Sequence, residues 1–193
     1  MPQRALISLL VALLLASCAA GSTPSRTKVR IAPDLDLVLP RPGDLGRSLD
    51  ATQLVQAHYG DQAMVFEGHV SVTPERLLLV VVDPLGRRAL SVTWTDAGVT
   101  YAAAPWLPAT VRPENMLADI VVLYWPEAIV RRSLVGGSLV ATPGARSVLV
   151  AGHEVIHADY QPATLGETWA GRAHYGNLPW GYDLDIQSAL SVP

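Results

Sequence analysis

One short motif in the sequence has the residue types and spacing of a zinc-dependent hydrolase, namely His153, Glu154 and His157 in the pattern HExxH. On a helix the two histidines share a face and bind one zinc ion, while the glutamate acts as the general base. The local sequence is typical of a strand instead, because two β-branched residues lie inside the motif, Gly152 precedes it and Pro162 follows it. In a strand, residues four apart lie about 13 Å apart, which is too far for one ion. We therefore expect surface histidines and no metal site here, and a zinc hydrolase is the least favoured alternative.

No other set of residues has the pattern of a catalytic centre. No nucleophile-elbow glycine pattern surrounds a serine, and the chain has no glycine-rich phosphate loop. Asp183 and Asp185 lie on one face of a predicted strand, and acidic residues in such positions usually face solvent. We therefore expect a protein that is not an enzyme and has no cofactor.

Cys18 is the only cysteine, and its surroundings predict covalent lipidation. Arg4 gives a basic start, and residues 5–15 form an apolar run that is too short for a membrane-spanning helix, which needs about 20 apolar residues. The tetrapeptide Leu-Ala-Ser-Cys that ends at Cys18 resembles the bacterial lipobox, in which the cysteine thiol receives diacylglycerol and becomes the new N-terminus. Residues 1–17 are therefore predicted to be a lipoprotein signal peptide; the alternative is a free cysteine after an ordinary signal.

The residue after the lipidated cysteine indicates the destination. Ala19 stands where enterobacterial sorting uses an acidic residue to retain lipoproteins at the inner membrane, so we expect the outer membrane, with the chain facing the periplasm. The 14 basic and 17 acidic residues give a formal net charge of −3, and Lys28 is the only lysine. Because nucleic-acid binding depends on a basic surface, we expect no nucleic-acid partner.

The length of 193 residues indicates one folded domain after the anchor. Residues 18–47 are rich in Pro, Gly, Ser and Thr, and are predicted to be the lipidated N-terminus and its tether. Leu35, Leu37 and Leu39 alternate with other residues and indicate one short strand inside this segment. Residues 48–193 are predicted to form the domain.

Most of the domain shows the alternation of strands. Residues 53–59 fit a helix or a strand, and we prefer a strand because alternating residues precede a Gly-Asp turn. The predicted strands cover residues 53–59, 64–73, 76–82, 90–94, 99–103, 146–151, 154–160, 169–175 and 182–187.

A helical pair interrupts the strands. Pro113 stands at a helix start, and the apolar residues 117, 120, 121 and 124 then fall on one helical face. Pro126 breaks this helix and starts a second one, which Gly136 and Gly137 stop. The sequence therefore predicts a mainly β (α+β) fold, an antiparallel meander with two helices.

The loop at residues 102–113 is unusually apolar. It contains Trp106 and Leu107 between two prolines, and an exposed pair of this kind inserts well into a bilayer surface. The alternative is that both side chains cap one end of the core.

Four short segments resemble the DUF3261 family of proteobacterial lipoproteins: DPLGRRALSVTW (83–94), LADI (117–120), WP (125–126) and GYDLDI (181–186). That family is similar to the outer-membrane lipoprotein receptor LolB, which has a similar Pro-Leu-Gly turn. The resemblance implies a LolB-like incomplete (half) β-barrel with a helical lid over an apolar cavity. It also implies that an apolar loop touches the membrane, a role for which Trp106 and Leu107 are the candidates.

Together these features predict a non-enzymatic outer-membrane lipoprotein that binds or inserts a lipid-like molecule or a lipoprotein. Its partners would be the membrane, through the lipid anchor, a LolA-like periplasmic carrier and a hydrophobic, lipid-like cargo. The main alternative is a structural or scaffold lipoprotein whose core is filled.

Overall fold

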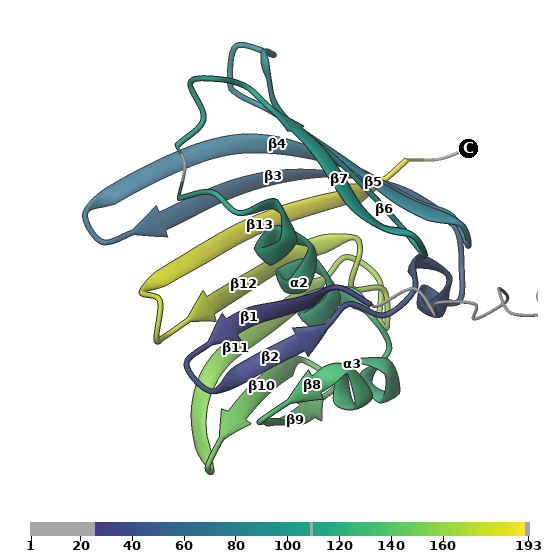
Figure 1. Cartoon of the computed structure of the whole chain (residues 1–193), viewed down its shortest axis with the longest axis vertical. Helices are drawn as coiled ribbons and strands as arrows, with labels where there is room; N and C mark the ends of the chain where they lie inside the picture. Colours follow the sequence, from purple (N-terminus) through teal and green to yellow (C-terminus); the bar gives the residue numbers. More distant parts are fainter. Residues whose placement is uncertain (1–25, 109, 192–193) are drawn as a thin grey trace, which may run out of the picture.

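The computed structural model describes residues 26–108 and 110–191, and Figure 1 shows their arrangement. Cys18 lies outside the described residues. The large sheet has ten strands, in the spatial order β7 (Gly98–Ala103), β6 (Arg88–Thr95), β5 (Arg76–Val82), β4 (Gln62–Val72), β3 (Leu49–Tyr59), β13 (Tyr182–Leu190), β12 (Gly171–Asn177), β11 (His153–Pro162), β10 (Ala145–Val150) and β9 (Ser138–Thr142). The other elements are a small sheet of β1 (Lys28–Ala32), β2 (Leu35–Val38) and β8 (Leu134–Val135), a short 3-10 helix η1 (Pro42–Leu45), and helices α2 (Pro113–Tyr124) and α3 (Glu127–Ser133).

The large sheet is curved but does not close into a barrel. Each half is an antiparallel meander, and the pairing of β3 with β13 joins the two halves. In the described part of the chain, β7 and β9 end the sheet and each has only one neighbour. The predicted mainly β fold, an open antiparallel barrel with two helices, is therefore confirmed.

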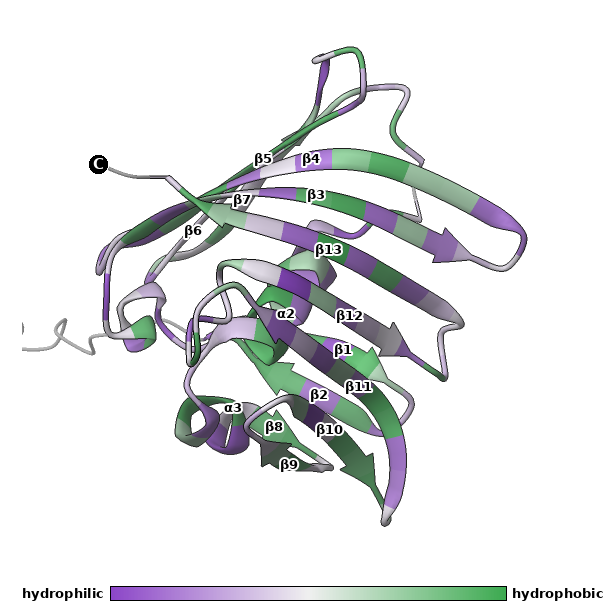
Figure 2. Cartoon of the chain, turned by 180° about the vertical axis from the view of Figure 1, so that it is seen from behind, coloured by the Kyte–Doolittle hydropathy of each residue, from purple (hydrophilic) through white to green (hydrophobic). Residues whose placement is uncertain are grey.

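Alternation along the strands separates a core face from a solvent face, as the hydropathy colours of Figure 2 show on the back of the sheet. In β6, Leu90, Val92 and Trp94 are buried, whereas the residues between them are half-exposed. The same period of two continues into β5 and β13. The inward rows therefore build one core on the concave side of the sheet.

Helix α2 lies within the concavity rather than on the surface. Pro113 starts it and Pro126 follows it, as predicted, because proline suits a first turn but cannot continue a helix. Every residue from Leu117 to Tyr124 is buried, which is typical of a helix covered on all sides. Among the described residues, no helix is long and apolar enough to cross a membrane.

The second helix ends earlier than predicted. Helix α3 stops at Ser133, and Leu134 begins β8, where it pairs with Leu37 of β2. Gly136 lies so close to the N-terminal hairpin that an added Cβ would approach the carbonyl oxygen of Asp34 to 2.1 Å. The two glycines thus permit close packing as well as following the helix.

The outer layer over α2 comes from residues that the sequence assigned to the tether. In the β1–β2 hairpin, Ile31, Leu35, Leu37 and Leu39 are 0–1 % exposed. Arg47, at the end of the expected tether, forms two hydrogen bonds of 2.7 Å with Glu167. Residues 28–47 therefore belong to the fold, and the domain starts before residue 48. The high proline and glycine content was misleading because hairpin turns use the same residues as linkers.

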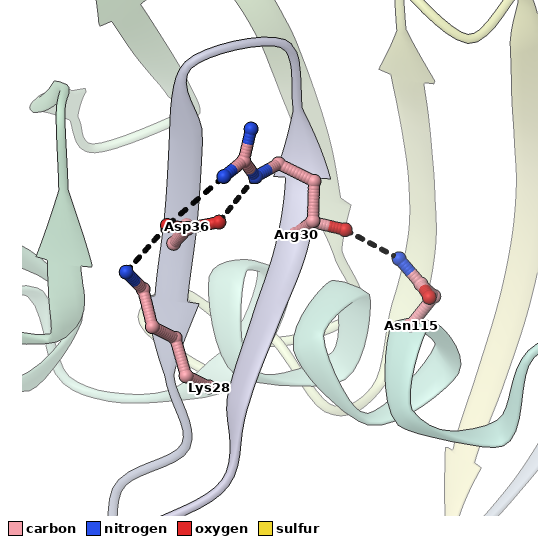
Figure 3. Close-up of polar contacts among 4 residues, drawn as sticks. All are labelled: Lys28, Arg30, Asp36 and Asn115. Atoms are coloured by element: carbon pink, nitrogen blue, oxygen red, sulfur yellow. Dashed lines mark hydrogen bonds and ion pairs between the residues drawn. The ribbon is translucent and has the colours of Figure 1, made fainter.

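The hairpin is tied to α2 by polar contacts (Figure 3). Asp36 accepts a hydrogen bond from the Arg30 side chain and forms an ion pair of 2.7 Å with Lys28. Asn115 of α2 donates a hydrogen bond of 2.9 Å to the main-chain oxygen of Arg30. Hydrogen bonds from Lys28 and Arg30 hold the pKa of Asp36 below its usual range, so Asp36 is a carboxylate at neutral pH.

Candidate functional site at the open end of the half-barrel

The β3–β4 hairpin extends past α2, on the left of Figure 1, and its inner face is left open there. A hollow of about 340 Å³ lies at this end and is lined by Ala57, Tyr59, Gln62, Ala63 and Met64. Ala57 pairs with Met64, and Tyr59 pairs with Gln62. These four residues continue the inward rows of the core, so the hollow lies on the concave side of the sheet.

The inward surface around this hollow is apolar but uncovered. Tyr59 is 65 % exposed and Met64 is 48 % exposed, although both continue the inward rows of the core. Core-facing apolar residues therefore stop being buried at this end of β3 and β4, and this open end of the half-barrel is the candidate site for an apolar ligand.

A buried carboxyl group fixes α2 to the sheet beneath it. Asp119 of α2 accepts a hydrogen bond of 2.6 Å from Tyr175 of β12 and one of 2.8 Å from Tyr182 of β13. Burial raises the pKa of Asp119 to about 7, although the two tyrosine hydroxyls oppose this shift. Near neutral pH, a small change in surroundings thus decides whether this residue carries a charge.

A second polar cluster lies at the C-terminal end of α2. Gln53 donates hydrogen bonds of 3.0 Å to Tyr124 and to Ser188, and all three residues are buried. The Tyr160 hydroxyl and the Arg146 guanidinium donate to the last main-chain carbonyls of the helix, each at 2.7 Å. The attachment of α2 to the sheet thus includes a set of directional polar bonds in addition to its apolar contacts.

The resemblance to LolB implied an enclosed apolar cavity, and the structure differs on this point. Trp125, Trp169 and Tyr175 are fully buried between the sheet and α2, and Tyr124 stacks on Trp169 at 4.2 Å. Over the described residues, the hollow at the open end and a second hollow along β3, β4 and β5 are both open to solvent. The helix and these aromatic rings fill the volume that a bound ligand would need, so a larger site requires α2 to move.

The two residues of the predicted membrane-insertion pair differ in their exposure to solvent. Trp106 is 47 % exposed, and the guanidinium of Arg87 lies 5.0 Å from the centre of its ring. Leu107 is half-buried against the core. The neighbouring β5–β6 turn presents Leu85, which is 79 % exposed and which sequence reasoning did not select. The sequence signal that could have identified Leu85 is its position, as an apolar residue, at the tip of a Pro-Leu-Gly turn.

Asp83 makes that turn rigid. Its carboxylate accepts hydrogen bonds from the main-chain N–H groups of Leu85 and Arg87 at 3.0 and 2.9 Å, and from the Arg87 side chain at 2.7 Å. The same carboxylate therefore shapes the turn and holds Arg87 beside Trp106. Leu85, Arg87 and Trp106 form an apolar tip with one cation, which we call the exposed tip.

The HExxH motif lies in a strand, as predicted. His153 begins β11, and His153 and Glu154 are exposed. The imidazole of His157 lies against Gly176 of the next strand, and only 4.0 Å separates it from the Glu154 carboxylate. The register of β10 and β11 shifts at this point, and the resulting bulge brings Glu154 and His157 to one face. In this strand His153 and His157 do not share a helical face, which is the arrangement that the alternative of a zinc hydrolase requires.

A family model described as "Protein of unknown function (DUF3261)" matches residues 50–190. The chain belongs to the DUF3261 family. The match runs from β3 to the last residue of β13, so it includes the whole large sheet and leaves the β1–β2 hairpin outside. All four segments that suggested the family from the sequence lie within it.

Two solved structures resemble the chain. A LolA superfamily protein from Nitrosomonas europaea is 12 % identical over 79 % of this chain and 92 % of its own, with a TM-score of 0.47. A DUF1329 family protein from Desulfovibrio piger is 6 % identical over 77 % of this chain and 87 % of its own, with a TM-score of 0.35. A comparison with curated proteins finds no match.

Proposed function

We propose that this protein is a non-enzymatic lipoprotein of the outer membrane, anchored through Cys18, whose open half-barrel binds the acyl chain of a lipid-like molecule or of a lipoprotein. The observation that carries the proposal is the uncovered inward surface at Tyr59 and Met64. This surface continues the core, so a ligand bound there would cover apolar side chains that the described part of the fold leaves exposed.

Energetics favour an acyl ligand at this surface. Each methylene group removed from water contributes about 0.8 kcal/mol, so a few methylenes on the open end already give measurable binding. A longer chain has to enter the space of α2. The polar bonds of Asp119 and Tyr124 would then be exchanged for bonds to water, at a net cost of about 1 kcal/mol each. Moving α2 also exposes apolar side chains such as Leu117 and Val121, so the acyl chain has to replace their contacts with the sheet. We infer that α2 is a movable lid whose place a long acyl chain takes.

Membrane contact is assigned to the exposed tip. Leu85 and Trp106 offer apolar side chains, and Arg87 offers a cation to lipid phosphates. Lys28, the first residue of β1, is ten positions after Cys18. A fully extended chain of that length spans about 35 Å at most, so the anchor would keep the domain close to the bilayer. A LolA-like carrier is the expected donor of cargo.

The test is native mass spectrometry of the Cys18→Ala full-length chain after incubation with vesicles of phosphatidylethanolamine and phosphatidylglycerol. We expect a lipid adduct that solvent extraction removes. Met64→Glu should abolish this adduct, because a carboxylate at the open end is not solvated by an acyl chain.

Leu54→Glu is the matched control. Leu54 is 50 % exposed, close to the exposure of Met64, but it lies on the outer face of β3 next to the buried Val55. The adduct should persist in this variant. Loss of the adduct in both variants, or its retention in Met64→Glu, would contradict the proposed site.

The second candidate function is a scaffold lipoprotein without a ligand. The filled interior around Trp125 and Trp169 favours it. The same experiment separates the two functions, since a scaffold gives the bare protein mass for the wild-type chain with every lipid tested.

A further inference from the structure

The outer face of the large sheet brings histidine and aspartate side chains together across three neighbouring strands. His58 of β3 lies directly opposite Asp183 of β13, and Asp185 of β13 lies directly opposite His174 of β12. These positions alternate with the inward rows of the core, so all four side chains point away from the concave site. On Figure 2 this face is the one toward the viewer, where β3, β13 and β12 lie side by side.

Three of these side chains, those of His58, Asp183 and Asp185, also bring their possible metal-ligating atoms close together. One ligand atom from each of His58, Asp183 and Asp185 lies within 4.8 Å of the others. The Nε2 atom of His58 is 3.9 Å from the Oδ2 atom of Asp185. The other oxygen of Asp185, Oδ1, lies 2.9 Å from Nδ1 of His174.

These distances and atom types are close to those of a three-ligand metal site. Bonds from zinc to imidazole nitrogen and carboxylate oxygen are about 2.1 Å long, so two ligands of one ion lie at most about 4.2 Å apart. Small side-chain rotations that move each ligand atom by a few tenths of an ångström bring the three atoms into that range. Imidazole with carboxylate suits first-row divalent ions such as zinc, and the exposed side of Asp185 leaves room for water as further ligands.

We propose that His58, Asp183 and Asp185 form a binding site for a divalent transition-metal ion, zinc in particular. In this site His174 is a positioning residue. Its hydrogen bond occupies one carboxylate oxygen of Asp185 and directs the other toward His58, which is the usual second-sphere arrangement of a ligating carboxylate. The site lies on the side of the sheet opposite the acyl surface, so it is independent of the proposed function.

The site also explains a histidine grouping that the HExxH motif does not. The His157 ring stacks on the His174 ring at 5.5 Å and lies over Gly176. His157 therefore supports His174 rather than pairing with His153. The motif in the sequence drew attention to the wrong two histidines of this surface.

The experiment is isothermal titration of zinc chloride into the full-length chain, purified in detergent without a histidine tag and stripped with EDTA. We expect one zinc ion per chain with micromolar affinity. His58→Ala and Asp185→Asn should each weaken binding about tenfold or more, because each removes a ligand. His174→Ala should weaken it by about tenfold, and His174→Asn, whose amide can replace the Nδ1 hydrogen bond, should restore most of the affinity.

His69→Ala is the matched control. His69 forms a comparable exposed pair with Glu67 at 2.8 Å, but among the residues that the structure describes it belongs to no such three-ligand group. Its loss should leave zinc binding unchanged, and the melting temperature in EDTA shows that each variant is folded. The proposal is overturned if the wild-type chain binds no zinc, if His58→Ala binds it as tightly as the wild type, or if a His153→Ala variant loses the ion.

Discussion

At the scale of single residues, Asp119 has the most unusual environment. It is a carboxyl group buried between α2 and the sheet, and its described hydrogen-bond partners are two tyrosine hydroxyls rather than a cation. Burial without a cation favours the protonated form, which is why its pKa rises to about 7. The proposed lid is therefore held by a group that changes charge near neutral pH.

This environment predicts a pH dependence of stability. Below about pH 4, Asp119 is protonated in both the folded and the unfolded chain. Between about pH 4 and pH 7 the unfolded chain loses this proton while the folded chain keeps it, so the free energy of unfolding falls as the pH rises. Above pH 7 the contribution is constant. The total change is on the order of a few kcal/mol.

Asp119→Asn should flatten that slope, because an amide does not titrate. We expect the difference in melting temperature between variant and wild type to move in favour of the variant by several degrees from pH 5 to pH 8. Circular dichroism melts at both pH values measure it. Asp36→Asn is the control: its carboxyl has a lowered pKa, so its effect should not change in this window. Parallel curves for wild type and Asp119→Asn would exclude Asp119 as the titrating group.

At the scale of elements, the β1–β2 hairpin and α2 depend on each other. The hairpin covers the outward side of α2, and Asn115 joins them through the main chain of Arg30. β8 continues the hairpin as a third strand, and Gly136 permits its turn to approach Asp34. Helix α2, the proposed lid, is thus fixed to the sheet by Asp119 and to the hairpin on its other side by Asn115.

Gly136→Ala should therefore destabilise the fold by about 1–3 kcal/mol, because it adds a clash to a left-handed residue with φ of 94°. Urea unfolding measures the change. Gly144→Ala is the matched control, since an added Cβ there meets nothing within 4 Å and its backbone has no positive φ. Equal stability of the two variants would show that the hairpin does not pack on β8 as described.

At the scale of the whole molecule, three surfaces lie on different parts of one sheet. The proposed acyl-binding surface is at the open end of the concave face, and the proposed metal site is on the outer face. The exposed tip is formed where the β5–β6 turn meets the loop that leads to α2. A single sheet can carry all three because its alternating rows separate inward from outward residues.

The exposed tip predicts how the chain associates with membranes when the proposed lipid anchor is absent. The Leu85→Ala/Trp106→Ala variant of the Cys18→Ala full-length chain should bind anionic vesicles at least about fivefold more weakly than its parent, because two apolar side chains leave the interface. Vesicle co-sedimentation measures the binding. Leu165→Ala, at a leucine that is 97 % exposed between β11 and β12, should have no effect. A similar loss with Leu165→Ala would indicate non-specific adsorption.

Most strands of the large sheet, the helical pair and the family could be predicted from the sequence because they depend on local order: period two, a proline at each helix start, and short family motifs. The strand at residues 154–160 was predicted for the same reason, and a strand there does not give the HExxH motif the helical context that zinc binding needs. Leu85 and the open end were not predicted, since exposure is decided by which neighbours cover a residue and not by its type.

Tertiary structure alone decided what residues 28–47 do and what fills the half-barrel. A hairpin and a tether share their turn-forming residues, and only contact with α2 distinguishes them. Asp119 is separated by 56 positions from Tyr175, and His58 by 125 from Asp183. Residues this far apart meet only through the packing and strand pairing of the folded chain. Neither the hydrogen bonds of Asp119 nor the histidine–aspartate group therefore has a local signal in the sequence.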